Sequence, residues 1–183
     1  AMNEIRRREL RLRLYGEAQG FAERNAAISA EAAVFHAMGE TDATLEGLPV
    51  MVMGYGLFGR EVAHRLNALG ARVTVLARRE EARRLARSDG MRACPVEAFS
   101  ALAGDSGMVL NTVPARVLNR ERLSALPKDC VLLELASAPG GFDPEDARKL
   151  GLRQRNLPGL PGKYAPEAAC RQLFSREKEE KTL

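Results

Sequence analysis

Residues 48–59 read LPVMVMGYGLFG, and this stretch decides the fold. The apolar run at 48–53 is typical of a short strand that is buried on both faces of a parallel sheet. It leads directly into the G-x-G-x-x-G pattern of residues 54–59. Val62, Leu66 and Leu69 follow at helical spacing, and Gly70 then predicts the end of the helix. The stretch therefore predicts a strand, a tight glycine turn and an amphipathic helix in succession.

The three glycines of this turn suit the binding of a dinucleotide. Gly54 permits the tight turn, Gly56 lets the main chain approach a pyrophosphate, and Gly59 allows the helix to pack closely on the strand. Backbone N–H groups and the positive end of the helix dipole would then face the phosphates. The pattern alone is weak evidence, but its position between a buried strand and a helix is the context that a dinucleotide site requires.

The choice between NAD and NADP is read at the end of the next strand, predicted at 72–77. An NAD site has an acidic residue there, about 20 residues after the glycines, to bind the ribose 2′-hydroxyl. This chain has Ala77-Arg78-Arg79 instead, and two guanidinium groups can bind a 2′-phosphate. The alternative is that both arginines begin the next helix and that Glu80 or Glu81 reaches the ribose. We therefore favour NADP over NAD.

The rest of the chain alternates strands with helices, which predicts an α/β fold with a doubly wound parallel sheet (Rossmann) in three α/β/α layers. Three segments are expected: a helical arm at 1–45, one dinucleotide-binding domain at 46–175 and a charged tail at 176–183. Further strands are expected at 91–94, 107–112, 130–136 and 152–155, and helices at 17–39, 78–90, 96–102 and 143–151 and from Pro166.

Composition excludes several classes of protein. The chain has 183 residues, of which 45% are hydrophobic, and a formal charge of +4, as expected of one compact domain with a real core. It contains neither a long apolar run nor the apolar region of a signal peptide, which predicts a cytoplasmic protein without a membrane span. Three widely spaced cysteines predict neither a disulfide framework nor a metal site.

The N-terminal arginines do not indicate nucleic-acid binding. The first fifteen residues hold Arg6, Arg7, Arg8, Arg11 and Arg13, interleaved with aliphatic residues. The whole chain has three Tyr, six Phe and no Trp to stack on bases. A solvated helix or a helix that packs on a partner is favoured. An apolar helical arm without a core of its own also predicts a homo-oligomer.

The reaction chemistry is expected in the loops at the carboxyl ends of the strands. Asn111 and Ser137 are the best polar candidates near a nicotinamide ring, although both residue types are also ordinary in turns. Lys163 could contact an anionic substrate or remain solvated. The loops in question are residues 111–114, 136–141 and 158–163.

The two histidines lie early in the chain. His36 falls in the N-terminal helical segment, and His64 falls on the helix after the glycine turn, away from its apolar stripe. Dehydrogenation of an alcohol usually needs a general base with a pKa near neutrality, most often histidine, close to the carbinol. The second half of the chain offers no histidine, which argues against that chemistry.

Several separated motifs carry a family resemblance. The fingerprint region up to Arg79, together with NTVPARVL, LLELASAPGG and LPGLPGKYAPEAA, resembles the dinucleotide-binding half of the family formed by the A subunits of dipicolinate synthase, from about residue 28 to residue 174. That family is related to the NAD-binding domain of D-isomer 2-hydroxyacid dehydrogenases. The resemblance implies NADP-dependent oxidation of dihydrodipicolinate, a small dicarboxylate, to dipicolinate, the spore-core calcium chelator. It also implies a flavoprotein-like second subunit.

The resemblance also implies the cofactor-binding residues, while it assigns no catalytic residue. Gly54, Gly56, Leu57, Phe58 and Gly59 would line the pyrophosphate. Arg78 and Arg79 would bind the 2′-phosphate, with Ala77 beside them in the cofactor site. The residues around the nicotinamide end would be Thr112, Val113, Pro114, Ala136, Ser137, Leu160 and Pro161.

Two other functions stay open at this point. The first is a fragment of an NADP-dependent 2-hydroxyacid-type dehydrogenase, and the second is a non-catalytic dinucleotide-sensing module whose basic N-terminal helix docks on a partner. Related subunits carry a further domain before the matched region. This chain is therefore expected to bind the cofactor but to be catalytically incomplete alone.

Overall fold

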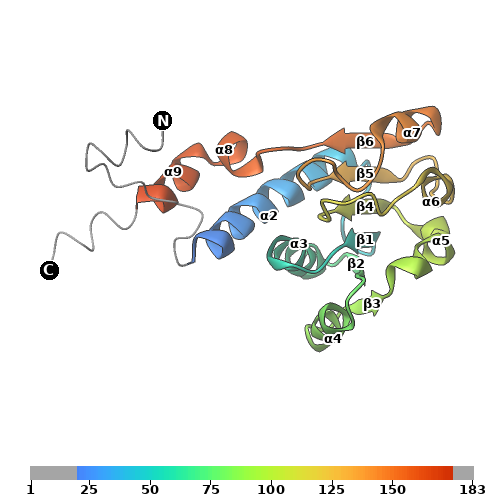
Figure 1. The fold of residues 1–183 in the computed structure, drawn as a ribbon, viewed down its shortest axis with the longest axis horizontal. Coiled ribbons are helices and arrows are strands. Elements are labelled where there is room, and N and C mark those ends of the chain that lie inside the picture. Colours follow the sequence, from blue (N-terminus) through green and yellow to red (C-terminus); the bar gives the residue numbers. More distant parts are fainter. Residues whose placement is uncertain (1–19, 175–183) are drawn as a thin grey trace, which may run out of the picture.

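The computed structural model describes residues 20–174, which form a three-layer α/β/α domain around one parallel sheet (Figure 1). The strands follow the order β3-β2-β1-β4-β5-β6, and each pair is parallel. The order reverses direction between β1 and β4, so the predicted doubly wound Rossmann sheet is confirmed. The strands are β1 (Pro49–Met53), β2 (Arg72–Leu76), β3 (Arg92–Cys94), β4 (Met108–Asn111), β5 (Val131–Glu134) and β6 (Arg153–Asn156).

Helices cover both faces of the sheet. One face packs on α2 (Phe21–Glu40), α3 (Leu57–Ala68), α4 (Glu80–Ser88) and α8 (Leu160–Tyr164). The other face packs on α5 (Phe99–Leu102), α6 (Arg120–Ser124) and α7 (Pro144–Lys149). The last helix, α9 (Pro166–Phe174), begins at the residue predicted for it and lies with α8 beside α2, beyond the edge of the sheet (Figure 1).

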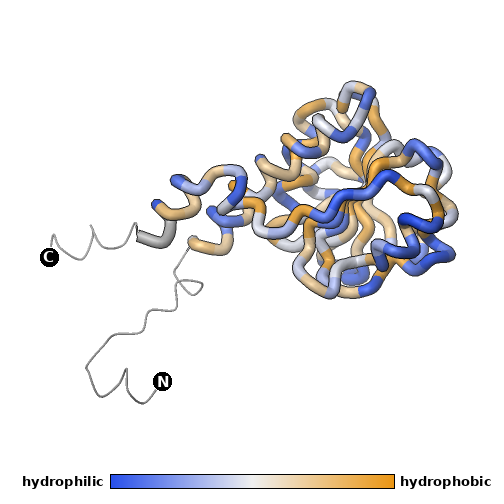
Figure 2. Tube along the Cα trace, turned by 90° about the horizontal axis from the view of Figure 1, so that it is seen from above, coloured by the Kyte–Doolittle hydropathy of each residue, from blue (hydrophilic) through white to orange (hydrophobic). Residues whose placement is uncertain are grey.

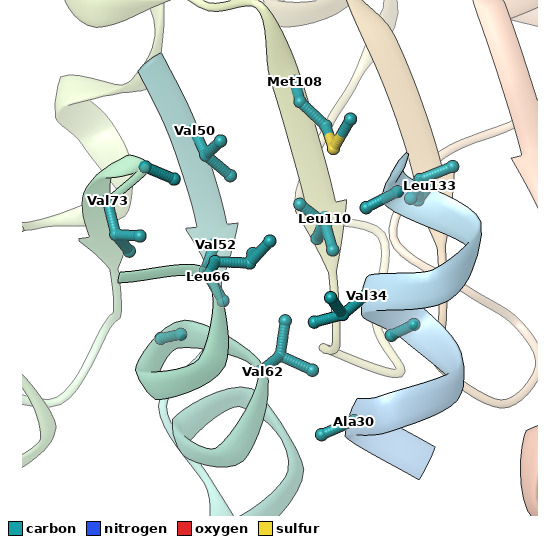
Figure 3. Packing of buried hydrophobic residues seen from close by; sticks show 14 of the residues in the cluster. Ala30, Val34, Val50, Val52, Val62, Leu66, Val73, Met108, Leu110 and Leu133 are labelled. Atoms are coloured by element: carbon teal, nitrogen blue, oxygen red, sulfur yellow. The ribbon is translucent and has the colours of Figure 1, made fainter. Parts of the chain in front are cut away.

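Alternation along the strands produces two hydrophobic cores. On β1, Val50 and Val52 face the core under α2 and α3, while Met51 and Met53 face the core under α5, α6 and α7. Every residue of β4 and β5 is buried, as expected for central strands covered on both faces. Figure 2 shows these strands as a hydrophobic centre inside the domain, and Figure 3 shows the packing of the first core.

Small side chains let α2 pack closely on α3. Ala30, Ala33 and Ala37 are fully buried in the core that also contains Val62 and Leu66 of α3 (Figure 3). The predicted N-terminal helix is thus confirmed over residues 21–40, and it shares its core with the sheet. The boundary between residues 45 and 46 stays a prediction. The basic segment at 1–19 and the charged tail at 176–183 lie outside the described residues.

Several local predictions were wrong. Residues 158–163 were expected to form a loop, but α8 begins at Leu160 because Pro161 is compatible with the first turn of a helix. The helix expected at 96–102 is divided into a 3-10 turn and the short α5, and α6 was not predicted. Leu69 is 45% exposed because α3 ends before it.

Asp143 caps α7, since its side chain accepts a hydrogen bond from the backbone N–H of Glu145 at 2.9 Å. None of the helices within residues 20–174 is both long enough and apolar enough to cross a membrane.

Candidate functional site

The glycine turn lies at the carboxyl end of β1, where the strand order reverses. Gly54 has a φ of 92°, in the left-handed region that favours glycine, and its N–H donates to the carbonyl oxygen of Leu76 on β2 at 2.9 Å. Gly56 is the N-cap of α3, and no side chain caps this end of the helix. The first N–H groups of α3 therefore remain available to a ligand.

The three glycines differ in how closely other atoms approach them. A Cβ atom at Gly59 would lie 2.5 Å from the carbonyl oxygen of Gly54, and a Cβ atom at Gly54 would lie 2.8 Å from Oγ1 of Thr112. A Cβ atom at Gly56 would meet no protein atom within 4 Å. Gly54 and Gly59 thus serve the fold itself, whereas the protein leaves open space at Gly56.

That space belongs to a cavity of about 660 Å³ at the carboxyl edge of the sheet, a volume typical of small-molecule sites. It brings together all but four of the predicted cofactor residues. The predicted residues that line it are Gly54, Gly56, Leu57, Phe58, Gly59, Ala77, Arg78, Arg79, Thr112, Val113 and Pro114.

The other four predicted residues do not line this cavity. Ala136 and Ser137 lie on the loop after β5, and Leu160 and Pro161 lie in α8. Leu160 is only 4% exposed and belongs to the first hydrophobic core. The contacts expected of these four residues with a nicotinamide ring stay predictions.

The cavity carries an excess of positive charge. Arg78 and Arg79 lie on one wall, and Arg116 and Arg122, which the sequence analysis missed, come from the segment after β4, while Glu97 is the acidic residue of the lining. Arg116 follows Pro114 by two residues within the NTVPARVL motif, which was a usable signal. Nothing local in the sequence marks Arg122, which reaches the cavity only by folding. Among residues 20–174, no acidic side chain forms an ion pair with Arg78 or Arg79.

Glu80 and Glu81, the alternative ribose ligands, lie outside this cavity. Glu80 accepts hydrogen bonds from Arg87 at 3.0 Å and from Arg83 at 2.9 Å, and the bonds from these two guanidinium groups lower the pKa of its carboxyl group. Glu81 lies 3.6 Å from Arg84. Both carboxylates therefore serve ion pairs along α4.

Tyr55 anchors the glycine turn to the end of α4. Its hydroxyl donates to Oδ2 of Asp89 at 2.7 Å, and Arg60 Nε donates to the same oxygen at 3.0 Å. The hydrogen bond from Tyr55, followed by those from His64 and Arg60, holds the pKa of Asp89 below its usual value, while burial raises the pKa of Tyr55. His64 Nε2 lies 3.1 Å from Oδ2 of Asp89, so this histidine belongs to the anchor.

Asn111 is placed differently from the expectation that it would face a nicotinamide ring. It is fully buried at the end of β4, and its Nδ2 group donates to Oε1 of Glu134 at 2.7 Å. Glu134, at the end of β5, was missed by the sequence analysis, although an acidic residue in the apolar run VLLELA was a usable signal. Neither side chain lines the cavity, and both form hydrogen bonds to the loops around it.

The remaining candidates do not line the cavity. His36 makes an edge-on contact with Phe35 on α2, and Lys163 is exposed on α8. Within residues 20–174, no cluster of three or more His, Cys, Asp or Glu side chains is arranged to hold a metal ion.

The strand order, the glycine turn and the cavity define a dinucleotide-binding domain, and comparison with known proteins gives its family. The sequence profile of the D-isomer specific 2-hydroxyacid dehydrogenase, NAD binding domain, matches residues 17–140. This chain belongs to that family. It is a dinucleotide-binding domain of the oxidoreductase type.

Within the family, the chain is similar to the A subunit of dipicolinate synthase. It is 36% identical to that protein of Bacillus subtilis (strain 168) over 147 residues, which cover 79% of this chain and 49% of the relative. The predicted resemblance is confirmed. This chain therefore spans about half the length of the curated relative that it matches.

Solved structures agree with this comparison. The crystal structure of the dipicolinate synthase A subunit from Bacillus halodurans matches with a TM-score of 0.88 and 32% identity. The match covers 98% of this chain and 62% of the chain of that subunit. The same subunit from Bacillus subtilis also has a TM-score of 0.88, with 30% identity and coverage of 99% and 61%. The structure of a transhydrogenase from Sinorhizobium meliloti shares the fold, with a TM-score of 0.73 and 18% identity. The match covers 88% of this chain and 56% of the transhydrogenase chain.

Replacement of Gly56 by valine tests whether the open space at the turn holds the dinucleotide. Gly56→Val is expected to leave the free protein folded, because a Cβ atom there meets no protein atom within 4 Å. It is expected to weaken coenzyme binding at least about tenfold, since the side chain would occupy the place of the pyrophosphate. Calorimetric titration with NADPH and NADH measures the affinity.

Gly104→Val is the matched control, because Gly104 also has open space around its Cβ position but does not line the cavity. Unchanged coenzyme affinity in folded Gly56→Val protein would contradict the assignment of the turn.

Proposed function

We propose that this chain is the NADP-binding domain of an oxidoreductase similar to the A subunit of dipicolinate synthase, which oxidises dihydrodipicolinate to dipicolinate. One observation carries the coenzyme part of the proposal. The open glycine turn and the Arg78-Arg79 pair line the same cavity, while Glu80 and Glu81 are held outside it by other arginines. The substrate part rests on the similarity to dipicolinate synthase.

The residues of the chain would bind the two ends of the coenzyme separately. The N–H groups at the start of α3 would bind the pyrophosphate, and Arg78 and Arg79 would bind the 2′-phosphate with charge-assisted hydrogen bonds. When bound, the oxidised coenzyme accepts a hydride. The loops at 112–114 and 136–141 would orient its nicotinamide end toward the substrate, which would give up one hydride to the coenzyme and one proton to solvent.

The proposed reaction does not require a histidine in the cavity. Neither His36 nor His64, the two histidines of the chain, lines it. Oxidation of a dihydropyridine ring creates an aromatic ring, which supplies driving force, so positioning of the two reactants provides much of the rate effect. A 2-hydroxyacid dehydrogenase needs a general base beside its carbinol, which makes that alternative less well supported.

The arginine pair predicts a preference for NADP. The double substitution Arg78→Ala with Arg79→Ala is expected to raise the Kd for NADPH about 10- to 100-fold, the equivalent of about 1.5–3 kcal/mol for hydrogen bonds to a charged group. The Kd for NADH should change little, because NADH has no 2′-phosphate. Titration of each variant with both coenzymes measures the difference.

Arg84→Ala is the control for this experiment, because Arg84 lies on the same helix as Glu81 but does not line the cavity. Tighter binding of NADH than of NADPH by the unaltered chain would make the assignment of the arginine pair wrong.

A single-turnover experiment tests the proposed reaction. The chain is mixed with oxidised NADP and dihydrodipicolinate, and the absorbance of the reduced coenzyme is followed. Any coenzyme reduction is expected with dihydrodipicolinate and not with malate, a 2-hydroxy dicarboxylate. Reduction with malate alone would favour the 2-hydroxyacid dehydrogenase alternative. Coenzyme binding without reduction by either compound would favour either a nucleotide-sensing module or a chain that is catalytically incomplete alone.

We also infer that the chain forms a homo-oligomer in addition to pairing with a second synthase subunit. An apolar groove of about 450 Å³ runs between α2, α3 and α8. Phe35 is 60% exposed there and Met38 is 57% exposed. Glu31 and Arg65 at the groove have opposite charges. Arg65 already pairs with Glu61 of its own helix, and a two-fold axis can bring Glu31 of one copy to this pair in the other. A second copy of this chain is therefore the proposed occupant.

Sedimentation equilibrium tests this inference. The double substitution Phe35→Ser with Met38→Ser is expected to convert the oligomer to a monomer, because it removes the largest apolar side chains exposed in the groove. Leu85→Ser is the control, since Leu85 is 39% exposed but lies on α4, outside the groove. A monomeric unaltered chain would contradict the inference.

A further inference from the structure

A buried carboxylate lies at the carboxyl edge of the sheet and takes no part in the coenzyme contacts described above. Glu134 ends β5, and its residue is only 5% exposed. Its Oε1 atom accepts hydrogen bonds from Asn111 Nδ2 at 2.7 Å and from the backbone N–H of Ala136 at 2.9 Å. Its Oε2 atom accepts a third hydrogen bond, from the backbone N–H of Gly141 at 2.7 Å. One side chain thus holds both ends of the 136–141 loop.

Asn111 extends these contacts to the neighbouring loop. It ends β4, which pairs with β5 so that Asn111 and Glu134 are register partners. The same Nδ2 group donates to the carbonyl oxygen of Val113 at 2.9 Å, and Oδ1 accepts from the Val113 N–H at 3.2 Å. Val113 lines the coenzyme cavity. The Glu134-Asn111 pair therefore joins the cavity wall to the 136–141 loop.

Gly141 forms a second connection between the 136–141 loop and the cavity wall. Its carbonyl oxygen accepts hydrogen bonds from the backbone N–H groups of Val117 at 2.9 Å and Leu118 at 2.8 Å, and Val117 also lines the cavity. A side chain at Gly141 would overlap the amide of Asn111. The two loops are thus connected at both ends of the wall formed by residues 113–117.

We propose that Glu134 is a positioning residue that fixes the 136–141 loop relative to the coenzyme wall and so sets the place of the nicotinamide end. This inference rests on the proposed function, because it assumes that the dinucleotide lies along that wall. Glu134 would act through Asn111 and Gly141, without touching the coenzyme. It would therefore affect the nicotinamide half of the site and leave the adenosine half unchanged.

The contacts require a carboxylate at this position. All three partners of Glu134 are donors, and an ionised carboxylate only accepts. Glutamine has nearly the same shape, but its NH₂ group must face at least one N–H donor. Two donors converge on Oε1 and one on Oε2, so the amide oxygen of glutamine is expected to stay with Asn111 and Ala136. The N–H group of Gly141 then loses its acceptor, and the 136–141 loop is released.

The variant Glu134→Gln is tested first by hydrogen exchange of the free protein. Exchange is expected to increase at least about tenfold at the amides of Gly141, Val117 and Leu118, the amides whose acceptors depend on this contact. Exchange in β1 should not change. Glu121→Gln is the matched control, because it removes the same charge from an exposed residue of α6.

Ligand binding by the same variants separates positioning from general damage. The Kd for NADPH is expected to increase about tenfold in Glu134→Gln, whereas the Kd for adenosine 2′,5′-bisphosphate, which lacks the nicotinamide end, should not change. Gly141→Ala, which pushes the loop away from Asn111 without removing a charge, is expected to act in the same way. Gly104→Ala is its control, since its Cβ position is open.

Two results would overturn the inference. Unchanged exchange at Gly141, Val117 and Leu118 in Glu134→Gln would show that the carboxylate does not hold the loops. An equal loss of affinity for NADPH and for adenosine 2′,5′-bisphosphate would show that it acts on stability alone. Failure of the unaltered chain to bind either ligand would instead reject the proposed function, and the exchange measurement would still decide whether the carboxylate connects the loops.

Discussion

The site depends on how closely the start of α3 approaches the end of β1. A side chain at position 59 would have to occupy space 2.5 Å from the carbonyl oxygen of Gly54, and only glycine avoids that collision. Thr112 fits against the same turn, with its Oγ1 donating to the carbonyl oxygen of Met53 at 2.7 Å. Because of this packing, the free N–H groups at the start of α3 lie at the centre of the carboxyl edge of the sheet. Every other contact proposed for the coenzyme is arranged around that point.

Local sequence patterns predicted the parts of the fold that short segments determine. The apolar run of β1, the glycine turn and the Arg78-Arg79 pair depend on neighbouring residues, and the structure places the turn and both arginines at one cavity. Glu134 and Asn111 depend on the pairing of β4 with β5, which joins residues far apart in the chain. The local sequence around Asn111 did not show that its side chain would donate to a buried carboxylate. The same residues would also suit an asparagine exposed in a turn.

The α2 helix shows a second limit of sequence patterns. Large apolar residues at helical spacing usually mark the buried face of a helix, but Phe35 and Met38, which have this spacing, are exposed. The buried face of α2 instead consists largely of alanines, since small side chains permit the close packing on α3 seen in Figure 3. The larger residues are thereby left on the outer face. Phe35 and Met38 are exposed because alanines form the contact with α3.

The ionisable groups around the cavity favour phosphate binding over acid-base chemistry. Four arginines and one glutamate line the cavity, so its residues favour phosphate groups over a proton-transfer role. Asp89 and His64 are engaged in anchoring Tyr55, and Glu134 is engaged in holding two loops. The ionisable groups close to the turn are therefore used for position. The proposed hydride transfer fits such a use of the ionisable groups, because it forms an aromatic ring and depends on the relative position of two rings more than on a general base.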